Sequence, residues 1–253
     1  MRKIVRYVLF SLETILIFLV VGAVTTAITK NIYSMVLVEQ FKSKGVFNEL
    51  KFNEYIKIYE IQSNEVIPTT TIYGSEIAPG GPGDILLSLT SEIEYPILKE
   101  FVSFFAGGHA CIVLDELEDK HIFANSNRIV ETTGLEPGQN LSIIANKNYW
   151  LSDSIYKEMI GLRVKMTDSQ RKKVISKAVS LHGDPYNFSF IIDTVNKSYC
   201  SDLVKKAYES IGINLNKDGF TTSVYDLLVS KETYISYYHY FDNQGVKHIY
   251  YLV

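Results

Sequence analysis

The first apolar segment of the chain is continuous rather than periodic. It runs from Tyr7 to Ile28, Glu13 is its one charged residue, and three basic residues lie within the six positions before it. A helix over this segment rises about 33 Å, which is enough to cross a hydrocarbon core of about 30 Å. The basic residues favour an N-terminus inside the cell and the rest of the chain outside. Residues 1–29 are therefore predicted to be a single-pass membrane anchor, with the bulk of the chain on the extracytoplasmic side.

A cleaved signal peptide is the alternative interpretation of the same segment, and it would make the protein secreted. The basic start suits either interpretation, and Thr25-Thr26-Ala27 is the candidate cleavage site. Small residues at set positions mark such sites, and here that pattern is weak while the apolar run is long. The anchor is the favoured prediction.

The segment that follows the anchor has a different pattern. Apolar residues recur at helical spacing from Ser34 to Glu60, which predicts one or two helices. The glycine- and proline-rich stretch Pro79–Gly83 interrupts the chain. Residues 30–82 are thus predicted to form a helical spacer or lid, and residues 83–253 a separate folded domain.

Strand-like and helix-like patterns alternate in residues 83–253. The predicted strands are Asp84–Leu89, His109–Leu114, His121–Asn125, Arg128–Thr132, Ile160–Met166, Tyr234–Phe241 and His248–Val253. The predicted helices are Tyr95–Phe105, Asp168–Leu181 and Tyr199–Ile211. Thr167 and Gln170 have the spacing of a capping box before the second of these helices. The order of elements predicts an α+β fold, with helices packed on a mostly antiparallel sheet.

A cysteine begins the last predicted helix. Cys200 shares an apolar stripe with Leu203, Val204, Ala207 and Ile211, so its sulfur is expected to point toward the sheet. A thiol at a helix N-terminus faces unpaired N–H groups and the positive end of the macrodipole. Both favour the thiolate, the form that attacks carbonyl groups. Cys200 is therefore the candidate nucleophile.

A histidine at the start of an upstream strand is the candidate base. His109 follows a pair of glycines, which let another group approach closely, and an imidazole near a thiol completes an activated nucleophile. The other histidines are expected to be solvated or satisfied in strands. Cys111 lies inside a strand with no helix N-terminus behind it, so it is a poor nucleophile, although it shares a strand face with His109. His109 and Cys111 alone do not make a metal site, and none is predicted.

Five short motifs in a fixed order carry a resemblance to a known family. GDILLS, GHACIVL, IVETTG, DPYNFSF and YCSDLV resemble the YiiX/YebB-type permuted papain-like hydrolases, which are circularly permuted relatives of the NlpC-type cell-wall peptidases and of lecithin:retinol acyltransferase. In this family the histidine precedes the cysteine. The resemblance covers Gly83 to the C-terminus. It implies that Cys200 is the nucleophile, His109 the base and Glu131 the acid that orients the histidine.

Three tyrosines are the candidate substrate-binding residues. The backbone N–H of Cys200 is the natural first donor to an oxyanion, and the second is open between Tyr199, Tyr73 and a backbone group. Tyr186, next to Pro185, is expected to line the approach to the site, with an ordinary turn as the open alternative.

Composition narrows the possible partners. A formal net charge of −3 and the absence of a basic block argue against nucleic acid. Two cysteines are too few for a disulfide scaffold. The chain has no phosphate-binding glycine loop, and no cofactor is predicted.

Together these features predict a membrane-anchored cysteine hydrolase. It is expected to cleave an amide bond through a thioester acyl-enzyme, with cell-wall peptide as the leading substrate. Lipid acyl hydrolysis or transfer is one alternative, since an anchor would hold the site near acyl chains. A catalytically silent binding module that uses the same groove is another.

Overall fold

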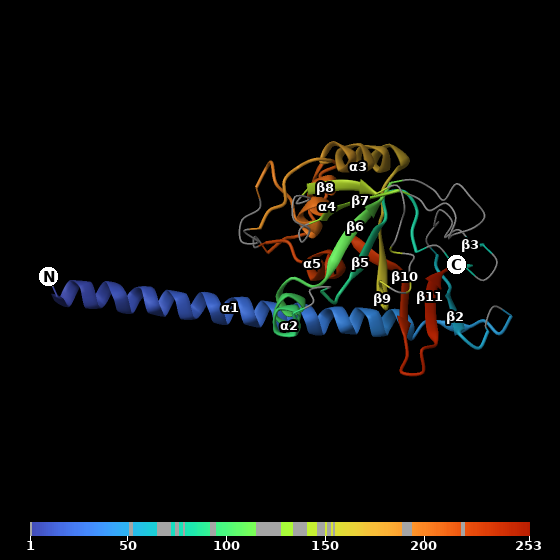
Figure 1. The fold of residues 1–253 in the computed structure, drawn as a ribbon, viewed down its shortest axis with the longest axis horizontal. Coiled ribbons are helices and arrows are strands. Elements are labelled where there is room, and N and C mark those ends of the chain that lie inside the picture. The colour runs from blue at the N-terminus through green and yellow to red at the C-terminus, as the bar shows by residue number, and fades with distance from the viewer. Residues whose placement is uncertain are drawn as a thin grey trace.

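The computed structural model describes residues 2–50, 53–64, 72–73, 76–77, 79–91, 95–114, 128–133, 141–145, 150, 153, 155–188, 194–218 and 221–253. The fold is α+β, with a mixed, mostly antiparallel sheet and a long apolar N-terminal helix (Figure 1). Its elements are α1 (Arg2–Lys42), β1 (Val46–Phe47), β2 (Ile56–Ile61), β3 (Ile72–Tyr73), β4 (Glu76–Ile77), β5 (Ile85–Ser88), α2 (Pro96–Phe105), β6 (His109–Val113), β7 (Ile129–Thr133), β8 (Leu141–Ala145), β9 (Glu158–Val164), α3 (Asp168–Ser180), α4 (Cys200–Glu209), α5 (Val224–Val229), β10 (Thr233–Phe241) and β11 (Lys247–Leu252).

The main sheet has the strand order β1-β2-β11-β10-β9-β5-β6-β7-β8 within the described residues. Its neighbouring strands pair antiparallel except β2 and β11, which are parallel. β3 and β4 form a small separate hairpin. The central strands β5, β6 and β9 are almost entirely buried, which explains the apolar runs Ile85–Leu87, Ala110–Val113 and Met159–Leu162 within them.

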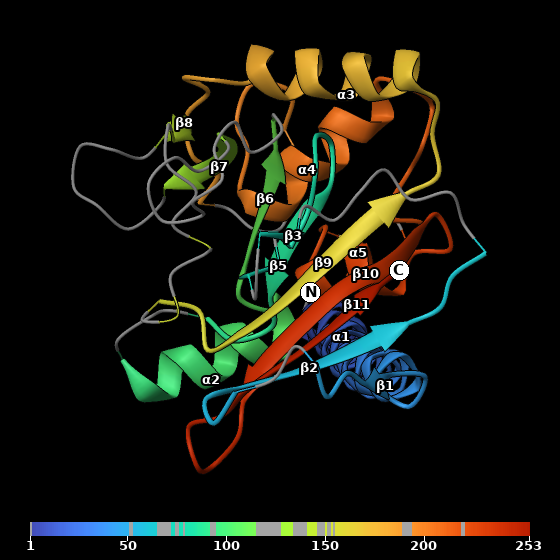
Figure 2. The ribbon, with the colours of Figure 1, turned by 90° about the vertical axis from the view of Figure 1, so that its right-hand side faces the viewer.

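The two faces of the sheet have separate cores, because side chains alternate along each strand. Ala110 and Ile112 of β6 belong to the core that includes the buried side of α4, and we call this side the helix face. Cys111 and Val113 belong to the core on the opposite face, together with Trp150. Figure 2 shows α4, α5 and the C-terminal part of α1 on one side of the sheet.

Helix α1 is continuous and has two different halves. Its N-terminal half is apolar and exposed and projects away from the sheet (Figure 1). Its C-terminal half contacts α2, α5 and β10 and buries Ala27, Ser34, Val38 and Phe41 along one side. This spacing is that of an amphipathic helix packed on a core.

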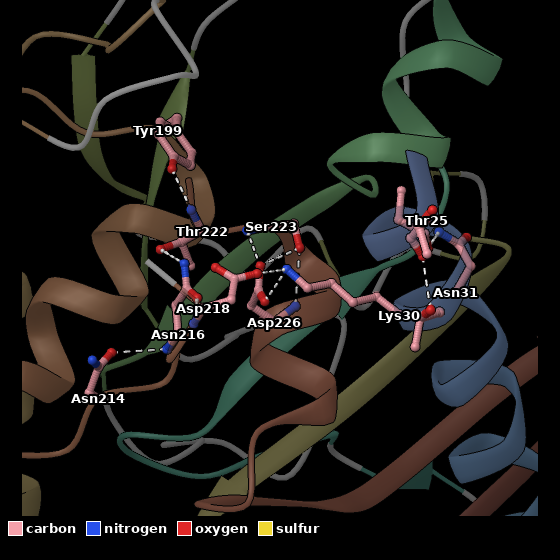
Figure 3. Close-up of polar contacts among 12 residues, drawn as sticks. Thr25, Lys30, Asn31, Tyr199, Asn214, Asn216, Asp218, Thr222, Ser223 and Asp226 are labelled. Carbon is pink, nitrogen blue, oxygen red and sulfur yellow. Dashed lines mark hydrogen bonds and ion pairs between the residues drawn. The ribbon is translucent and has the colours of Figure 1, made fainter. Parts of the chain in front are cut away.

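A cluster of charges fixes the docked half of α1. Lys30 Nζ lies 2.5 Å from Asp218 Oδ2 and 2.6 Å from Asp226 Oδ1, and we call these three residues the anchor cluster (Figure 3). Asp226 also accepts a 2.8 Å hydrogen bond from the backbone N–H of Ser223 in the capping box of α5. The adjacent Thr222 donates its N–H to the hydroxyl of Tyr199, at 2.8 Å. The anchor cluster is therefore connected, residue by residue, to the start of α4.

The helices predicted over Ser34 to Glu60 are correct only as far as Lys42. Beyond it, Val46–Phe47 and Ile56–Ile61 are strands. The side chain of Asn53 accepts hydrogen bonds from the N–H groups of Tyr55 and Ile56, each at 2.8 Å. Such local bonds compete with helix formation, and the β-branched isoleucines that follow suit the parallel pairing with β11.

Most of the other predicted elements are confirmed, with ends that shift by a few residues. α2, α3, α4, β5, β6, β7, β9, β10 and β11 all lie where the patterns placed them. The capping box at Thr167 and Gln170 is also present. The strand predicted over His121–Asn125 lies outside the described residues. Strand β8 and helix α5 were not predicted, since each is short and neither has a distinctive period.

Candidate active site

The sulfur of Cys200 lies at the start of a buried helix. Leu203, Val204 and Ala207 on the same stripe are fully buried against the helix face of the sheet. The first backbone hydrogen bond of α4 runs from the N–H of Leu203 to the carbonyl of Tyr199, at 2.9 Å. The N–H groups before it have no partner within the helix, and that of Ser201 interacts with the sulfur of Cys200.

His109 begins β6 directly after a glycine pair whose packing requires glycine. A Cβ at Gly108 would lie 2.2 Å from the carbonyl oxygen of Thr90, and one at Gly107 would lie 2.7 Å from Cβ of Val224. Gly107 also has a φ of +81°, a conformation that L side chains rarely adopt. The glycine pair thus lets the chain turn tightly from α2 into the strand that carries the imidazole.

Glu131 lies on the neighbouring strand β7 and is fully buried. Its Oε2 is 3.2 Å from Nε2 of His109. An ionised carboxylate can only accept a hydrogen bond, so Nε2 carries the hydrogen and Nδ1 is left for the thiol. The structure therefore brings together the three residues that the sequence singled out.

The thiol of Cys200 and the imidazole of His109 are close enough to shift each other's pKa. Burial alone raises the pKa of Cys200, but the hydrogen bond and charge of His109, with hydrogen bonds from the N–H groups of Ser201 and Ala110, outweigh it. The pKa of the thiol is therefore lowered. Burial likewise lowers the pKa of His109, yet its hydrogen bonds to Cys200 and Glu131 raise that pKa well above the ordinary value. These directions favour a thiolate–imidazolium pair.

Trp150 is a further residue at this site, one that sequence reasoning missed. Its indole Nε1 donates to Oε2 of Glu131 at 3.3 Å. Its ring stacks on His109, with centroids 5.6 Å apart, and on Tyr156, with centroids 4.1 Å apart. It is the one tryptophan of the chain, and no motif or period marks it. Trp150 therefore contacts both the acid and the imidazole.

The three candidate substrate-binding tyrosines differ in position. Tyr186 is half-buried, and burial together with the charge of Cys200 raises its pKa. Tyr199 is buried, and its hydroxyl accepts from Thr222. Tyr73 belongs to the β3–β4 hairpin outside the main sheet.

Cys111 lies on the other side of the sheet from α4. It packs with Val113 and Trp150, whereas Cys200 packs with Ala110 and Ile112. Both cysteines are free. Burial, followed by the charge of Glu131, raises the pKa of Cys111 well above its ordinary value. These surroundings agree with the prediction that Cys111 is a poor nucleophile.

Two further histidines are satisfied within strands. His239 Nδ1 lies 3.0 Å from the hydroxyl of Tyr237, and its Nε2 lies 3.2 Å from the carbonyl oxygen of Tyr156. Burial lowers the pKa of His239 to about 3. His248 Nε2 lies 3.0 Å from Oδ2 of Asp242. Within the described residues, no group of three or more His, Cys, Asp or Glu side chains has the geometry to hold a metal ion.

The fold and this arrangement of side chains define a class. A thiol at a helix start, a strand histidine that precedes it in the sequence and a buried acid behind the histidine are the features of a permuted papain-like protein. The family model described as permuted papain-like amidase enzyme, YaeF/YiiX, C92 family, matches residues 81–229, which is more than half of the chain. The chain belongs to this family of permuted papain-like amidases, as its motifs predicted.

One solved structure is similar to this chain, the crystal structure of the metalloprotein yiiX from Escherichia coli O157:H7. The alignment has 15% sequence identity and a TM-score of 0.46, and it covers 62% of this chain and 96% of that one. The family assignment rests on the family model alone. A search of curated proteins gave no match.

Proposed function

We propose that this protein is a membrane-anchored cysteine amidase that works through a thioester acyl-enzyme. The observation that carries the proposal is the grouping of three side chains at the start of α4, where His109 acts on the pKa of the Cys200 thiol and lies 3.2 Å from Oε2 of Glu131. In this group the pKa of the thiol is lowered and that of the imidazole is raised. Such an arrangement is what an activated thiol nucleophile requires.

In the first half of the reaction, the thiolate of Cys200 attacks the carbonyl carbon of the amide. The carbonyl oxygen becomes an oxyanion, and we expect the backbone N–H of Cys200 to stabilise it. The imidazolium of His109 then gives its proton to the nitrogen of the leaving amine, and the C–N bond breaks. The products are a free amine and a thioester on Cys200.

In the second half, His109 takes a proton from a water molecule that attacks the thioester. The C–S bond breaks, a carboxylic acid leaves, and the thiolate–imidazolium pair is restored. Glu131 fixes the ring tautomer and stabilises the imidazolium throughout. Tyr186 lines the approach to the sulfur. The burial of Tyr199 favours a supporting role beneath α4 over direct substrate contact.

We propose that α1 is retained as a membrane anchor on the extracytoplasmic side. The helix continues without a break through Ala27, and Ala27 is itself buried against the domain. Cleavage there would cut a helix whose following turns carry Lys30 of the anchor cluster. This packing favours an anchor over a signal peptide.

We propose cell-wall peptide as the substrate, because the anchor would place the site in the cell envelope and the related NlpC-type peptidases cleave such amides. A lipid acyl group is the second candidate. It is favoured by the position of His109, which begins β6 only four residues after the end of α2, a helix with exposed apolar side chains.

The test uses full-length protein in detergent or bilayer nanodiscs. A thiol-directed activity probe followed by intact-mass measurement should label Cys200 once, and Cys200→Ala should not be labelled there. The protein is then incubated with muropeptides and, separately, with phospholipids. New amino and carboxyl groups from muropeptides support the amidase, whereas released fatty acid supports the lipid alternative. Fast labelling with no product from either substrate would point to a binding module.

A further inference from the structure

Helix α2 exposes its large apolar side chains, in contrast to a surface helix of a soluble domain. None of its residues is buried. Ile97 is 89% exposed, Phe101 is 59% exposed, and Tyr95 just before the helix is exposed as well. A helix that faces water normally turns its large apolar side chains inward. Here they form one outward stripe.

The inner side of α2 makes polar contacts to the domain. The hydroxyl of Ser103 accepts a 2.9 Å hydrogen bond from the N–H of Ser91. The backbone carbonyl oxygen of Ser103 accepts a 2.7 Å hydrogen bond from the hydroxyl of Tyr225. The carbonyl of Phe104 accepts from Nδ2 of Asn31 in α1 at 3.0 Å. Polar groups therefore hold α2 in place while its apolar stripe is left exposed.

The hydrogen bond from Asn31 also fixes where α2 lies along α1. Asn31 follows the apolar run that ends at Ile28 by less than one helical turn. Figure 2 shows α1 end-on and α2 from the side, and Figure 1 shows the reverse, so α2 crosses the anchor helix. If α1 spans a bilayer, α2 lies across it at the level where the chain leaves the hydrocarbon.

We propose that α2 is an interfacial helix whose exposed stripe rests in the headgroup and upper acyl region of the leaflet from which α1 emerges. The inference rests on the proposed anchor. A short amphipathic helix that lies across a spanning helix at this level, with an aromatic residue at its start, has the chemistry of a bilayer surface contact. Phe18, on the free half of α1, is surrounded by the same bilayer.

This contact has a consequence for the site. α2 ends at Phe105 and His109 begins β6, with the tight glycine turn between them. The N–H of Val224 also donates to the carbonyl of Ala106, at 2.8 Å, and ties this turn to α5. An interfacial α2 therefore holds the catalytic imidazole close to the membrane surface, where it would act on substrates presented at that surface.

The test measures the depth of single labelled positions in vesicles. In a Cys111→Ala, Cys200→Ala background, an environment-sensitive fluorophore is attached to the full-length chain at Ile97→Cys, Phe18→Cys or Leu50→Cys. All three positions are exposed, and Leu50, at 97%, lies in the turn between β1 and β2 beyond the far end of α1. Each variant is reconstituted into phosphatidylcholine–phosphatidylglycerol vesicles. Some vesicles also carry lipids with a quencher near the headgroup or near the chain end.

The proposal expects the label at Ile97 to lose fluorescence with the shallow quencher, the label at Phe18 to lose it with the deep quencher, and the label at Leu50 to lose it with neither. Quenching at Phe18 with none at Ile97 overturns the interfacial helix and leaves the anchor standing. Absence of quenching at Phe18 refutes the anchor and the inference together. A further outcome combines two samples: the labelled Ile97→Cys protein shows no quenching, and the unlabelled Ile97→Cys protein forms disulfide-linked dimers. That outcome would overturn the interfacial helix and assign the stripe to contact with a second copy of the chain.

Discussion

Two groups of ionisable side chains in this protein use charge in different ways. In the anchor cluster, Lys30 lies between Asp218 and Asp226 at 2.5 and 2.6 Å. In the candidate catalytic group, the thiol of Cys200 and the imidazole of His109 are neutral or charged according to the position of one proton. Oε2 of Glu131 lies 3.2 Å from Nε2 of the imidazole.

This difference suits the anchor cluster to a structural role and the candidate catalytic group to a chemical one. In the anchor cluster Lys30 contacts both aspartates directly, and its ion pair with Asp226 joins α1 to α5. The charges of Cys200 and His109 exist only when the proton lies on the imidazole, and their pKa values are shifted toward that state. The first group should therefore affect stability and the second group turnover.

The largest effect is expected for Cys200→Ala. Loss of the nucleophile should reduce turnover roughly 10⁴-fold or more. Unfolding free energy should change by no more than about 1 kcal/mol, because alanine is tolerated at a helix start. The measurements are product formation and denaturant unfolding of the same preparation. Retained turnover would assign the nucleophile to another residue.

The next effect concerns His109→Ala, which should reduce turnover about 10²- to 10⁴-fold. It should also change how alkylation of Cys200 depends on pH. A lowered thiol pKa means that the wild-type thiolate persists below about pH 8.5 and is lost only as pH falls through the lowered value. Without the imidazole, burial remains and raises the thiol pKa, so the alkylation rate should already fall above about pH 8.5.

Iodoacetamide rates across a pH series, with the site of modification located by mass spectrometry, check this prediction. Cys111→Ala serves as the control and should keep the wild-type profile, since Cys111 packs in the core with Val113 and Ile129 and is not one of the three residues Cys200, His109 and Glu131. Identical profiles for wild type and His109→Ala would show that the imidazole does not activate the thiol.

A smaller effect, on stability rather than chemistry, is expected for Lys30→Met. The substitution leaves two carboxylates close together without their cation and should lower the unfolding free energy by about 2 kcal/mol. Thermal unfolding in detergent measures the loss, and turnover per folded molecule should stay at the wild-type level. Adding Asp226→Asn should recover part of the stability. A loss of turnover in fully folded Lys30→Met would mean that the chain of contacts through Thr222 and Tyr199 affects the site.

Much of the fold follows from local patterns in the sequence. The apolar strands β5, β6 and β9 and the capped helix α3 have periods and end signals that are independent of their surroundings. The helix expected over Ser34–Glu60 was wrong beyond Lys42, because the side-chain bonds of Asn53 and the pairing of β2 with β11 outweigh helical spacing. Strand pairing depends on residues nearly two hundred positions away and has no local signal.

The candidate site, too, could be predicted from the sequence only where a residue has a local signal. Cys200 and His109 are marked by a helix start and a glycine pair, and the resemblance added Glu131. Their catalytic roles stay predictions. Trp150 has no such mark, because its position comes from packing between β7 and Tyr156 on the second face of the sheet. A residue that acts by orienting others is found only when the fold is known.

The smallest predicted effect tests whether Trp150 is such a positioning residue. Trp150→Phe keeps an aromatic ring beneath His109 but removes the N–H that donates to Glu131. A hydrogen bond to a charged acceptor contributes about 1.5–3 kcal/mol, and its loss frees the carboxylate to turn away from the imidazole. We expect kcat to fall roughly tenfold with KM unchanged, after correction for the folded fraction. Weaker support of the imidazolium should also shift the alkylation profile of Cys200 toward higher pH.

Tyr156→Phe is the matched control, because it keeps the ring that stacks on Trp150 and leaves the indole N–H in place. If both variants lose activity equally with no shift in the profile, Trp150 is a packing residue and the orientation of Glu131 depends on other contacts.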